Sequence, residues 1–473
     1  MYSTSKRLLF GLALCLLYPP LNAQDFYFGA DLSYVNEMQD CGEDYLEESV
    51  VKDPYQIFAD HNCNLVRLRL WHTPSWYDDL NSGQRYSDFA DVRRSIIRAK
   101  QMGMQVLLDF HLSDNWADPS KQIVPAAWLE VVDDLPVLKD SLYNYISTTL
   151  IALAEEGLLP EMVQIGNETN KGILQSPEDN QEWMLDWDRN SQLFNRAIEA
   201  VRDVQDSTNT SIKIALHIAD PDNLGWLLEG FTNHGVTDYD VIGMSYYWAW
   251  HQPTSIAQVG ELISQLRQAY PGKDVMVFET AYIWTWESND NANNIINDVH
   301  DDYAPPSPEN QREWLIDLTE AVMGNGGTGV IYWEPAWISS PCYTQWGQGS
   351  HQEHATFFDF DNNLLEQGGI GWMTHDYTTA IKEPPGIEDF KCFLNETKQL
   401  LHLEFQNTTA DSLFYLKVAS AEGRILMNKK IETIPYARLI REVVMPDLPA
   451  GVYVVGLYSK QQLVGSRKLT VVK

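Results

Sequence analysis

Eight short apolar runs alternate with longer stretches of helical period between residues 26 and 333 of this chain. We expect the apolar runs to be buried strands, because they have strand length and end at polar or turn residues. Eight strands with intervening helices predict a (β/α)8 TIM barrel. The expected strands are residues 26–31, 65–71, 104–111, 163–167, 212–217, 239–246, 275–280 and 329–333, and the expected helices are 86–103, 137–156, 186–204, 255–270 and 311–323.

An open doubly wound sheet is the alternative fold for such an alternation. It would want a glycine-rich phosphate turn after the first strand. The run Gly29-Ala30-Asp31 does not supply one, so the barrel is favoured.

Two of the expected strands end on a glutamate. Glu168 follows residues 163–167, and Glu279 lies near the end of residues 275–280. Since the C-terminal strand ends of a barrel carry its active site, we expect these carboxyls to meet there. A retaining glycosidase needs one protonated and one ionised carboxyl, about 5–5.5 Å apart. The plainer interpretation is a structural ion pair or exposed loop glutamates, but the polar neighbours at both strand ends favour catalysis.

Other polar residues lie at the same strand ends. Asn167, directly before Glu168, is suited to hydrogen-bonding a sugar hydroxyl. Arg69 is expected to pair with the catalytic carboxylate and keep it ionised, whereas Arg67 is interpreted as part of a buried salt bridge. For His111 two interpretations stay equally open, a donor to a substrate hydroxyl and a buried core histidine.

Aromatic residues are abundant, with 16 tryptophans. Some must pack in the core, but tryptophan on loops suits stacking on sugar rings. Trp333 at the end of the eighth expected strand is predicted to be a sugar platform, which Trp116 and Trp346 can extend. Either Tyr246, our first choice, or Tyr247 is expected to hold the nucleophile through its hydroxyl.

The net charge of −33 limits the partners of the protein. It argues against nucleic acid and against polyanionic substrates. It fits an enzyme acting outside the cell on a neutral polymer, although a solvated acidic surface also accounts for it. We expect a monomer.

The N-terminus has the pattern of a signal peptide. Lys6 and Arg7 precede an apolar stretch at residues 8–17, which is too short to span a membrane. Cleavage is expected after Ala23, so residues 1–23 are assigned to the signal, and the protein is expected to be secreted or held at the cell surface. No later stretch is apolar and long enough for a membrane span.

Four cysteines remain after such cleavage, and export permits disulfides. Four scattered cysteines do not establish a disulfide framework, and the pairing among them stays open. Cys63, just before an expected strand, is predicted to be a buried thiol. The cysteines are Cys41, Cys63, Cys342 and Cys392.

The composition changes near residue 382. The barrel is assigned to residues 24–382, and residues 383–398, which begin Glu-Pro-Pro-Gly, are assigned to a linker. Residues 399–473 show short alternating runs separated by turn signals, which predicts a small antiparallel β-sandwich. The expected strands are residues 401–405, 413–418, 424–429, 452–457 and 469–472.

Seven short motifs in this order resemble the arabinogalactan endo-β-1,4-galactanases, glycoside hydrolase family 53, within a large clan of retaining (β/α)8 glycosidases. The resemblance covers residues 26–360, and Asp31 and Asp114 within it are expected to bind substrate. The motifs are GADLS at 29–33, VRLRLW at 66–71, DFHLSD at 109–114, WADP at 116–119, QIGNETN at 164–170, ETAY at 279–282 and YWEPAW at 332–337.

The resemblance implies Glu168 as acid/base, Glu279 as nucleophile and neutral β-1,4-galactan of pectin as substrate. Bacterial relatives often hold calcium in the loop after the seventh strand. Of the ligand positions, Asp290 and Asn294 remain here, while Ser288 and Ala292 replace better donors. Because calcium wants six or more oxygens, we predict weak or no calcium binding and no required cofactor.

A second departure leaves the distal subsites and the product length open, because Gln352 replaces an expected tryptophan. The alternatives to a galactanase are a mannanase or cellulase with the same barrel, and a non-catalytic glycan-binding protein. The presence of both glutamates argues against the second alternative.

The C-terminal tail resembles the sorting domain of the type IX secretion system. The resemblance lies in residues 448–455, in Gly465 and in the final KLTVVK at 468–473. It implies the secretion machinery as a partner. A carbohydrate-binding module and an inert sandwich are the alternatives, and the lack of tryptophan in the tail disfavours the former.

Overall fold

A computed structural model describes residues 26–377, 387–395, 399–409, 411–420, 425–446, 448–449, 451–459 and 462–471. The chain divides into two compact units, Met1–Asp376 and Tyr377–Lys473. The expected signal peptide at residues 1–23 lies outside the described residues. None of the helices within the described ranges is long and apolar enough to cross a bilayer.

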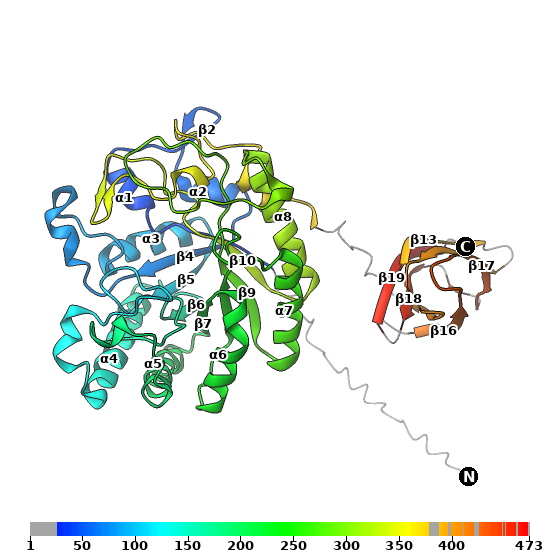
Figure 1. Cartoon of the computed structure of the whole chain (residues 1–473), viewed down its shortest axis with the longest axis horizontal. Helices are drawn as coiled ribbons and strands as arrows, with labels where there is room; N and C mark the ends of the chain where they lie inside the picture. The colour runs from blue at the N-terminus through cyan, green and yellow to red at the C-terminus, as the bar shows by residue number, and fades with distance from the viewer. Residues whose placement is uncertain are drawn as a thin grey trace, which may run out of the picture. The chain divides into compact units, whose positions relative to one another are not determined.

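The first unit is a closed barrel of eight parallel strands (Figure 1), so the predicted TIM barrel is confirmed. Neighbouring strands pair in parallel all the way round, and the last strand of the barrel closes onto the first. Every strand expected from the sequence is present within about three residues of its expected limits. They are β1 Tyr27–Asp31, β4 Leu65–Leu70, β5 Gln105–Phe110, β6 Met162–Ile165, β7 Lys213–Ala219, β8 Val241–Ser245, β9 Asp274–Glu279 and β10 Gly329–Tyr332.

Helices surround the barrel outside the strands (Figure 1). The six long ones begin after an Asp or Ser whose side chain accepts a hydrogen bond from the first turn, which satisfies a backbone N–H that a helix start leaves unpaired. They are α3 Phe89–Gln101, α4 Leu135–Glu155, α5 Trp187–Thr208, α6 Pro221–Asn233, α7 Ile256–Ala269 and α8 Pro308–Gly324. The short helices are α1 Val35–Asp40 and α2 Pro54–Asp60.

Helix α6 was not foreseen from the sequence, because Gly225 and Gly230 weaken its helical propensity. Gly230 has a packing reason: a Cβ there would lie 2.1 Å from the indole of Trp187. Helix packing therefore fixes an element that local sequence preference does not indicate.

The barrel interior changes character from one end to the other. Its lower layer is apolar and includes Leu65, Leu107, Met276 and Ile331. Toward the C-terminal strand ends the inward positions become polar, as with the buried Arg67. The apolar layer stabilises the fold, and the polar layer forms the floor of the site described below.

The second unit contains two antiparallel sheets around one apolar core, which confirms antiparallel sheets after the barrel. In the middle strand of the smaller sheet, Leu401, Leu403 and Phe405 are buried and alternate with less buried residues, as the two-residue period of a strand requires. The sheets have the orders β13-β14-β17 and β16-β15-β18-β19, with β13 Ile387–Asn395, β14 Leu400–Asn407, β15 Leu413–Ser420, β16 Ile425–Glu432, β17 Arg438–Val444, β18 Gly451–Ser459 and β19 Gln462–Val471.

Two assignments in this part of the chain were wrong. Residues 383–398 are not all linker, because strand β13 lies inside them and pairs with β14. Strand β17 was also missed, since Arg438, Arg441 and Glu442 interrupt its apolar pattern; it is stabilised by pairing with β14 along its whole length. The first unit ends at Asp376, six residues before the expected limit.

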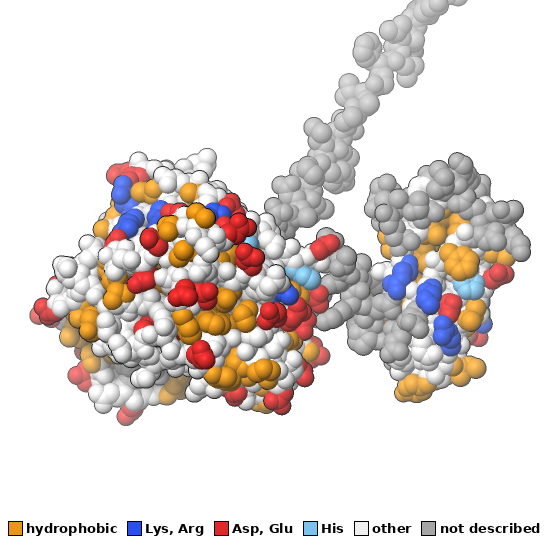
Figure 2. Space-filling view, turned by 90° about the horizontal axis from the view of Figure 1, so that it is seen from above, with side chains coloured by type: hydrophobic (Ala, Val, Ile, Leu, Met, Phe, Trp, Pro, Cys, Tyr) orange, Lys and Arg blue, Asp and Glu red, His pale blue; other side chains and the backbone are white. Residues whose placement is uncertain are grey.

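Acidic side chains are spread over the barrel unit on the face shown in Figure 2. They do not form one block there, and hydrophobic side chains lie between them. On this face the negative charge of the barrel unit is therefore distributed, as expected for a solvated acidic surface.

Candidate active site

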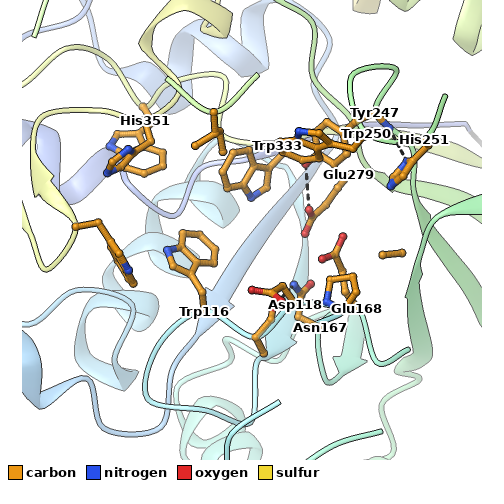
Figure 3. A pocket seen from close by; sticks show the side chains of 16 residues that line it. Trp116, Asp118, Asn167, Glu168, Tyr247, Trp250, His251, Glu279, Trp333 and His351 are labelled. Atoms are coloured by element: carbon orange, nitrogen blue, oxygen red, sulfur yellow. Dashed lines mark hydrogen bonds between the residues drawn. The ribbon is translucent and has the colours of Figure 1, made fainter. Parts of the chain in front are cut away.

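A cleft of about 510 Å³ opens at the C-terminal ends of the barrel strands. Both glutamates expected at the site line it, and Figure 3 shows their carboxyl groups directed toward each other. Six of the sixteen lining side chains are tryptophan or tyrosine. The lining residues are Trp116, Ala117, Asp118, Pro119, Asn167, Glu168, Ala219, Tyr247, Trp250, His251, Glu279, Ile295, Trp333, Trp337, Trp346 and His351.

Glu279 is the last residue of β9 and is 6% exposed. Its carboxylate oxygens have two different partners. Arg67 Nη1 donates to Oε1 at 2.8 Å, and the Tyr247 hydroxyl donates to Oε2 at 3.0 Å. Burial raises the pKa of Glu279, and the positive charge of Arg67 opposes that rise.

Arg67, rather than Arg69, is the cation beside Glu279. Its guanidinium, 1% exposed, also donates to Asp31 at 2.9 Å and to Asp109 at 3.0 Å. The expectation that Arg69 pairs with Glu279 was wrong. The two arginines share one face of β4, and only the tertiary structure shows which one reaches the opposite side of the barrel.

Arg69 has a separate environment. It donates to Glu334 at 3.0 Å, and its guanidinium lies 4.6, 4.4 and 4.2 Å from the ring centres of Tyr34, Trp71 and Trp116. Such contacts are attractive because a ring face is electron-rich. Arg69 therefore supports Trp116, one of the cleft aromatics, from below.

Glu168 follows β6 in a left-handed backbone conformation with φ of 45°. Non-glycine residues rarely adopt it, and such residues cluster at functional sites. The Ser245 hydroxyl donates to Glu168 Oε1 at 2.6 Å. Desolvation in the cleft raises the pKa of Glu168 well above the ordinary value, and the neighbouring Glu279 raises it further.

The two carboxyl groups have different partners, which favour an ionised Glu279 and a protonated Glu168. Glu279 contacts a permanent cation, whereas Glu168 accepts from the neutral hydroxyl of Ser245. A single proton shared by the pair is therefore most stable on Glu168. The site can present one acid and one carboxylate at the same pH.

Asn167 lines the cleft beside Glu168 and is held on both sides of its amide. Arg67 Nη2 donates to its Oδ1 at 2.7 Å, and its Nδ2 donates to the Ala117 carbonyl at 2.8 Å. One N–H of the amide stays available for a sugar hydroxyl. The predicted substrate contact is untested but sterically open.

The tyrosine that contacts Glu279 is Tyr247, and the choice of Tyr246 was wrong. The Tyr246 hydroxyl donates to the Thr254 carbonyl at 2.7 Å, on the outside of the barrel core. Residues at successive positions of a strand point to opposite sides. Because Ser245 faces the cleft, Tyr247 two positions later was the better choice.

Trp333, Trp116 and Trp346 all line the cleft, as expected from the sequence. The rings of Trp116 and Trp333 lie 5.8 Å apart, and those of Trp116 and Trp346 lie 6.3 Å apart. Trp346 is 39% exposed at the rim. Together they form a continuous apolar wall, which we call the aromatic wall.

Three other expected site residues do not line the cleft. Asp31 is buried and bonds Arg67, and Asp114 accepts from the backbone N–H groups of Thr73 and Ala126 in the surrounding loops. His111 is 1% exposed, with Nδ1 2.7 Å from Asp109. His111 is thus buried, but its Nε2 has no hydrogen-bond partner within the described part of the chain, so the two interpretations of His111 both stay open.

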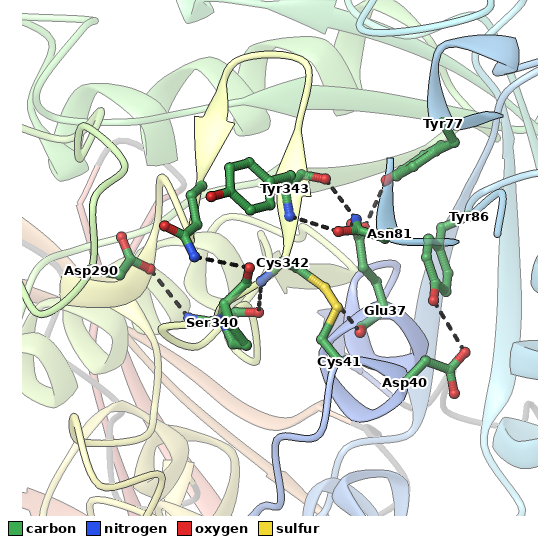
Figure 4. The surroundings of a disulfide bond; sticks show 12 residues. Glu37, Asp40, Cys41, Tyr77, Asn81, Tyr86, Asp290, Ser340, Cys342 and Tyr343 are labelled. Carbon is green, nitrogen blue, oxygen red and sulfur yellow. Dashed lines mark hydrogen bonds between the residues drawn. A yellow bond between two sulfur atoms is a disulfide. The ribbon is translucent and has the colours of Figure 1, made fainter. Parts of the chain in front are cut away.

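The short hairpin that carries Trp346, β11 Tyr343–Thr344 with β12 Gly347–Gln348, is attached covalently to the start of the barrel. A disulfide joins Cys342 to Cys41 after α1 (Figure 4). Asn81 pairs with the backbone of Tyr343 in both directions, at 2.7 and 2.9 Å. Cys63 is a buried free thiol, as predicted.

The loop after β9 is held by protein hydrogen bonds. Asp290 accepts from the backbone N–H groups of Ala292, Ser340 and Ser350. Glu353 accepts from the N–H groups of Asn289 and Asp290. The described part of the chain contains no cluster of three or more acidic, His or Cys side chains that could hold a metal.

Asn294, the second ligand candidate, donates from Nδ2 to Ser288 at 2.9 Å. Asn294 Nδ2 also lies 3.4 Å from Glu353 Oε1, and Asp290 accepts from the N–H groups of Ser340 and Ser350. These bonds tie the loop after β9 to the loop after β10, and weak or absent calcium binding stays a prediction.

Three residues at the cleft were not singled out from the sequence. Ser245 and His217 lie behind Glu168, and His251 lines the cleft beside Trp250 (Figure 3). Trp250 and Trp337 were also expected from the sequence to extend the sugar platform, and both line the cleft. The inward positions of β8 could have indicated Ser245, because the strand period fixes them, whereas the loop residue His251 carries no periodic signal.

Comparisons with known proteins agree on one family for the barrel. The sequence matches glycosyl hydrolase family 53 over residues 27–367. It is 46% identical over 344 residues to the arabinogalactan endo-β-1,4-galactanase of Cellvibrio japonicus, covering 72% of this chain and 89% of that protein. It is 36% identical over 361 residues to the endo-β-1,4-galactanase of Bacillus subtilis, covering 74% and 76%.

A solved structure also matches. The family 53 catalytic domain of Ignisphaera aggregans superposes with a TM-score of 0.66 and 32% identity, covering 75% of this chain and 97% of that domain.

Proposed function

This chain belongs to glycosyl hydrolase family 53, and we propose that it is a secreted endo-β-1,4-galactanase that cuts the galactan and arabinogalactan side chains of pectin. The similarity to two endo-β-1,4-galactanases supports the β-1,4 linkage and galactose as the sugar. The acidic surface supports a neutral polymer, because a polyanionic one would be repelled.

The proposed reaction is double displacement with retention. Glu279 attacks the anomeric carbon, and Glu168 gives its proton to the leaving glycosidic oxygen, so that a galactosyl-enzyme ester forms and the C–O bond breaks. Glu168, now ionised, takes a proton from water. The water oxygen attacks the anomeric carbon and releases Glu279.

The observation that carries these roles is the different set of partners of the two carboxyls. Arg67 and Tyr247 donate to Glu279 at 2.8 and 3.0 Å, which favours its ionised, nucleophilic form. Glu168 is desolvated and lies beside a second carboxylate, both of which favour its protonated form.

The first test is reducing-sugar release from β-1,4-galactan, with mannan and carboxymethylcellulose alongside, for the wild type and Glu279→Gln. We expect activity on galactan only, abolished in the variant. Activity on another glycan would be consistent with the proposed mechanism but would contradict galactan as the substrate. Glycan binding without hydrolysis of any of the three glycans would indicate that the protein is a non-catalytic glycan-binding protein.

Azide separates the roles of the two glutamates. With an activated aryl galactoside, Glu168→Ala plus azide is expected to give β-galactosyl azide, because azide replaces water in the second displacement. Glu279→Ala plus azide is expected to give the α-azide, because azide then replaces the nucleophile. The opposite pattern would exchange the assignments.

Secretion is part of the proposal. The Cys41–Cys342 disulfide supports export, since such bonds persist in oxidising compartments. We propose that the C-terminal sheets are a sorting signal recognised by the type IX secretion machinery. Loss of surface delivery on deletion of residues 377–473, with unchanged galactan affinity, would support sorting, whereas weaker affinity would indicate a binding module.

A further inference from the structure

Two fully buried side chains lie behind Glu168 and have no role in the reaction proposed above. Ser245 ends β8, and His217 lies on the neighbouring strand β7. Ser245 donates to Glu168 Oε1 at 2.6 Å, and its Oγ lies 3.0 Å from His217 Nε2. Glu168, Ser245 and His217 therefore form one chain of hydrogen bonds.

The far nitrogen of His217 meets both a donor and an acceptor. Its Nδ1 lies 2.9 Å from Asn167 Oδ1 and 3.1 Å from Gln164 Nε2. Arg67 fixes the orientation of both amides, because its guanidinium can only donate. It donates to Gln164 Oε1 at 3.0 Å and to Asn167 Oδ1 at 2.7 Å.

This environment satisfies His217 in either neutral tautomer. With the proton on Nε2, His217 donates to Ser245, and Nδ1 accepts from Gln164 Nε2. With the proton on Nδ1, His217 donates to Asn167 Oδ1, and Nε2 accepts from Ser245. Neither tautomer leaves a buried ring nitrogen of His217 unpaired. The Glu168 N–H, whose nitrogen lies 3.4 Å from Nδ1, can donate to the ring only when the proton is on Nε2.

The protonation state of Glu168 determines which group donates in each hydrogen bond of this series. An ionised Glu168 accepts from Ser245, whose oxygen then accepts from Nε2–H of His217. A protonated Glu168 can donate to Ser245, whose own proton then turns to Nε2. Ser245 and His217 hold the same number of protons in both states, and only Glu168 gains or loses one.

We propose that Ser245 and His217 are positioning residues that hold the Glu168 carboxyl in one place both as acid and as base, by reversing their hydrogen bonds and the tautomer of His217. This inference rests on the acid/base role proposed for Glu168. It explains how one side chain serves two steps that need opposite protonation states without changing its position.

Burial and the positive charges near His217 keep its imidazole neutral. Burial lowers the pKa of His217, and the facing Arg67 and His111 lower it further. Glu168 faces Glu279, Asp118 and Arg67. The proton that reaches the glycosidic oxygen is therefore stored on Glu168 and not on the imidazole.

The first test compares Ser245→Ala with wild type in pH–rate profiles. Removal of the donor destabilises ionised Glu168, so its pKa rises, and the alkaline limb of kcat/KM is expected to move up by about one pH unit. On an activated aryl galactoside, whose hydrolysis needs Glu168 only as base, kcat is expected to fall about tenfold. Ser245→Thr, which keeps the hydroxyl, should restore both.

Ser95→Ala is the matched control, since Ser95 is a buried serine on α3 that accepts from Asn36 at 2.8 Å, outside the cleft. It should leave the alkaline limb in place. An unshifted limb in Ser245→Ala would overturn the proposal.

The second test needs no variant and no turnover. In long-range ¹H–¹⁵N spectra of the whole wild-type protein, the His217 signals should change from Nδ1–H to Nε2–H as pH rises, with the midpoint of the alkaline limb. A single tautomer or an imidazolium throughout would overturn the inference. A protein inactive on every glycan with the tautomer change present would instead overturn the proposed function alone.

Discussion

The floor of the cleft and its aromatic wall are held by different means. On the floor, Arg67 bonds Asp31, Asp109, Asn167 and Glu279, all from different strands of one closed barrel. The wall stands on loops, and its Trp346 hairpin is fixed by the Cys41–Cys342 disulfide and by backbone bonds to Asn81. The floor is therefore rigid because it is buried, and the wall because it is cross-linked.

This difference separates chemistry from substrate recognition. A change on the floor alters charges that touch the reacting carboxyls, so it should lower kcat. A change in the wall alters a platform that contacts sugar in the ground state and the transition state alike, so it should raise KM. The following variants test that division, from the largest expected effect to the smallest.

Arg67→Met should have the largest effect, a fall in kcat of roughly 10²–10³-fold. The variant loses the cation that lowers the pKa of Glu279. That pKa therefore rises, and the acidic limb of the pH–rate profile should move to higher pH. Arg67→Lys keeps the charge but loses the forked geometry, so its kcat should lie between those of the wild type and Arg67→Met. An unmoved acidic limb in a folded Arg67→Met protein would contradict the role given to Arg67.

Tyr247→Phe should lower kcat about tenfold, because it removes one hydrogen bond to a charged group. Tyr246→Phe is its control, since that hydroxyl bonds the Thr254 carbonyl instead. The measurement is kcat on β-1,4-galactan for both variants. Equal losses would mean that the effect is structural rather than a contact with Glu279.

Cys342→Ser should raise KM for long galactan severalfold and leave kcat nearly unchanged. It should also lower the free energy of unfolding by about 2–5 kcal/mol, as removal of a disulfide commonly does. Cys63→Ala, at the buried thiol, controls for loss of a cysteine. A fall in kcat with unchanged KM would place the hairpin in the chemistry and remove the distinction between floor and wall.

Asp290→Asn should have the smallest effect, a decrease of a few degrees in Tm with little change in kcat. The loop bonds to Ser340 and Ser350 weaken when the carboxylate loses its charge. EDTA should not change the Tm of the wild type. A higher Tm on adding calcium, or sub-micromolar calcium affinity by calorimetry, would contradict the prediction of weak or no calcium binding.

The sequence was most informative where a regular period was present. The strand positions of the barrel and the strand-end places of Glu168 and Glu279 follow from apolar runs that stop at polar residues. The apolar period did not reveal α6, because glycines interrupt it, or β17, because charged residues interrupt it. It also could not show that β13 joins the sheet, since pairing depends on a partner elsewhere in the chain.

The sequence by itself determined the fold class, the two cleft glutamates and the family motifs, because buried strands and strand ends impose local patterns. Only the tertiary structure decided that Arg67 rather than Arg69 reaches Glu279, that Tyr247 rather than Tyr246 faces it, and that Cys41 meets Cys342. The reason is physical. Side chains two residues apart look alike to a local pattern, and only barrel closure sets which of them crosses the interior to meet a partner from a distant strand.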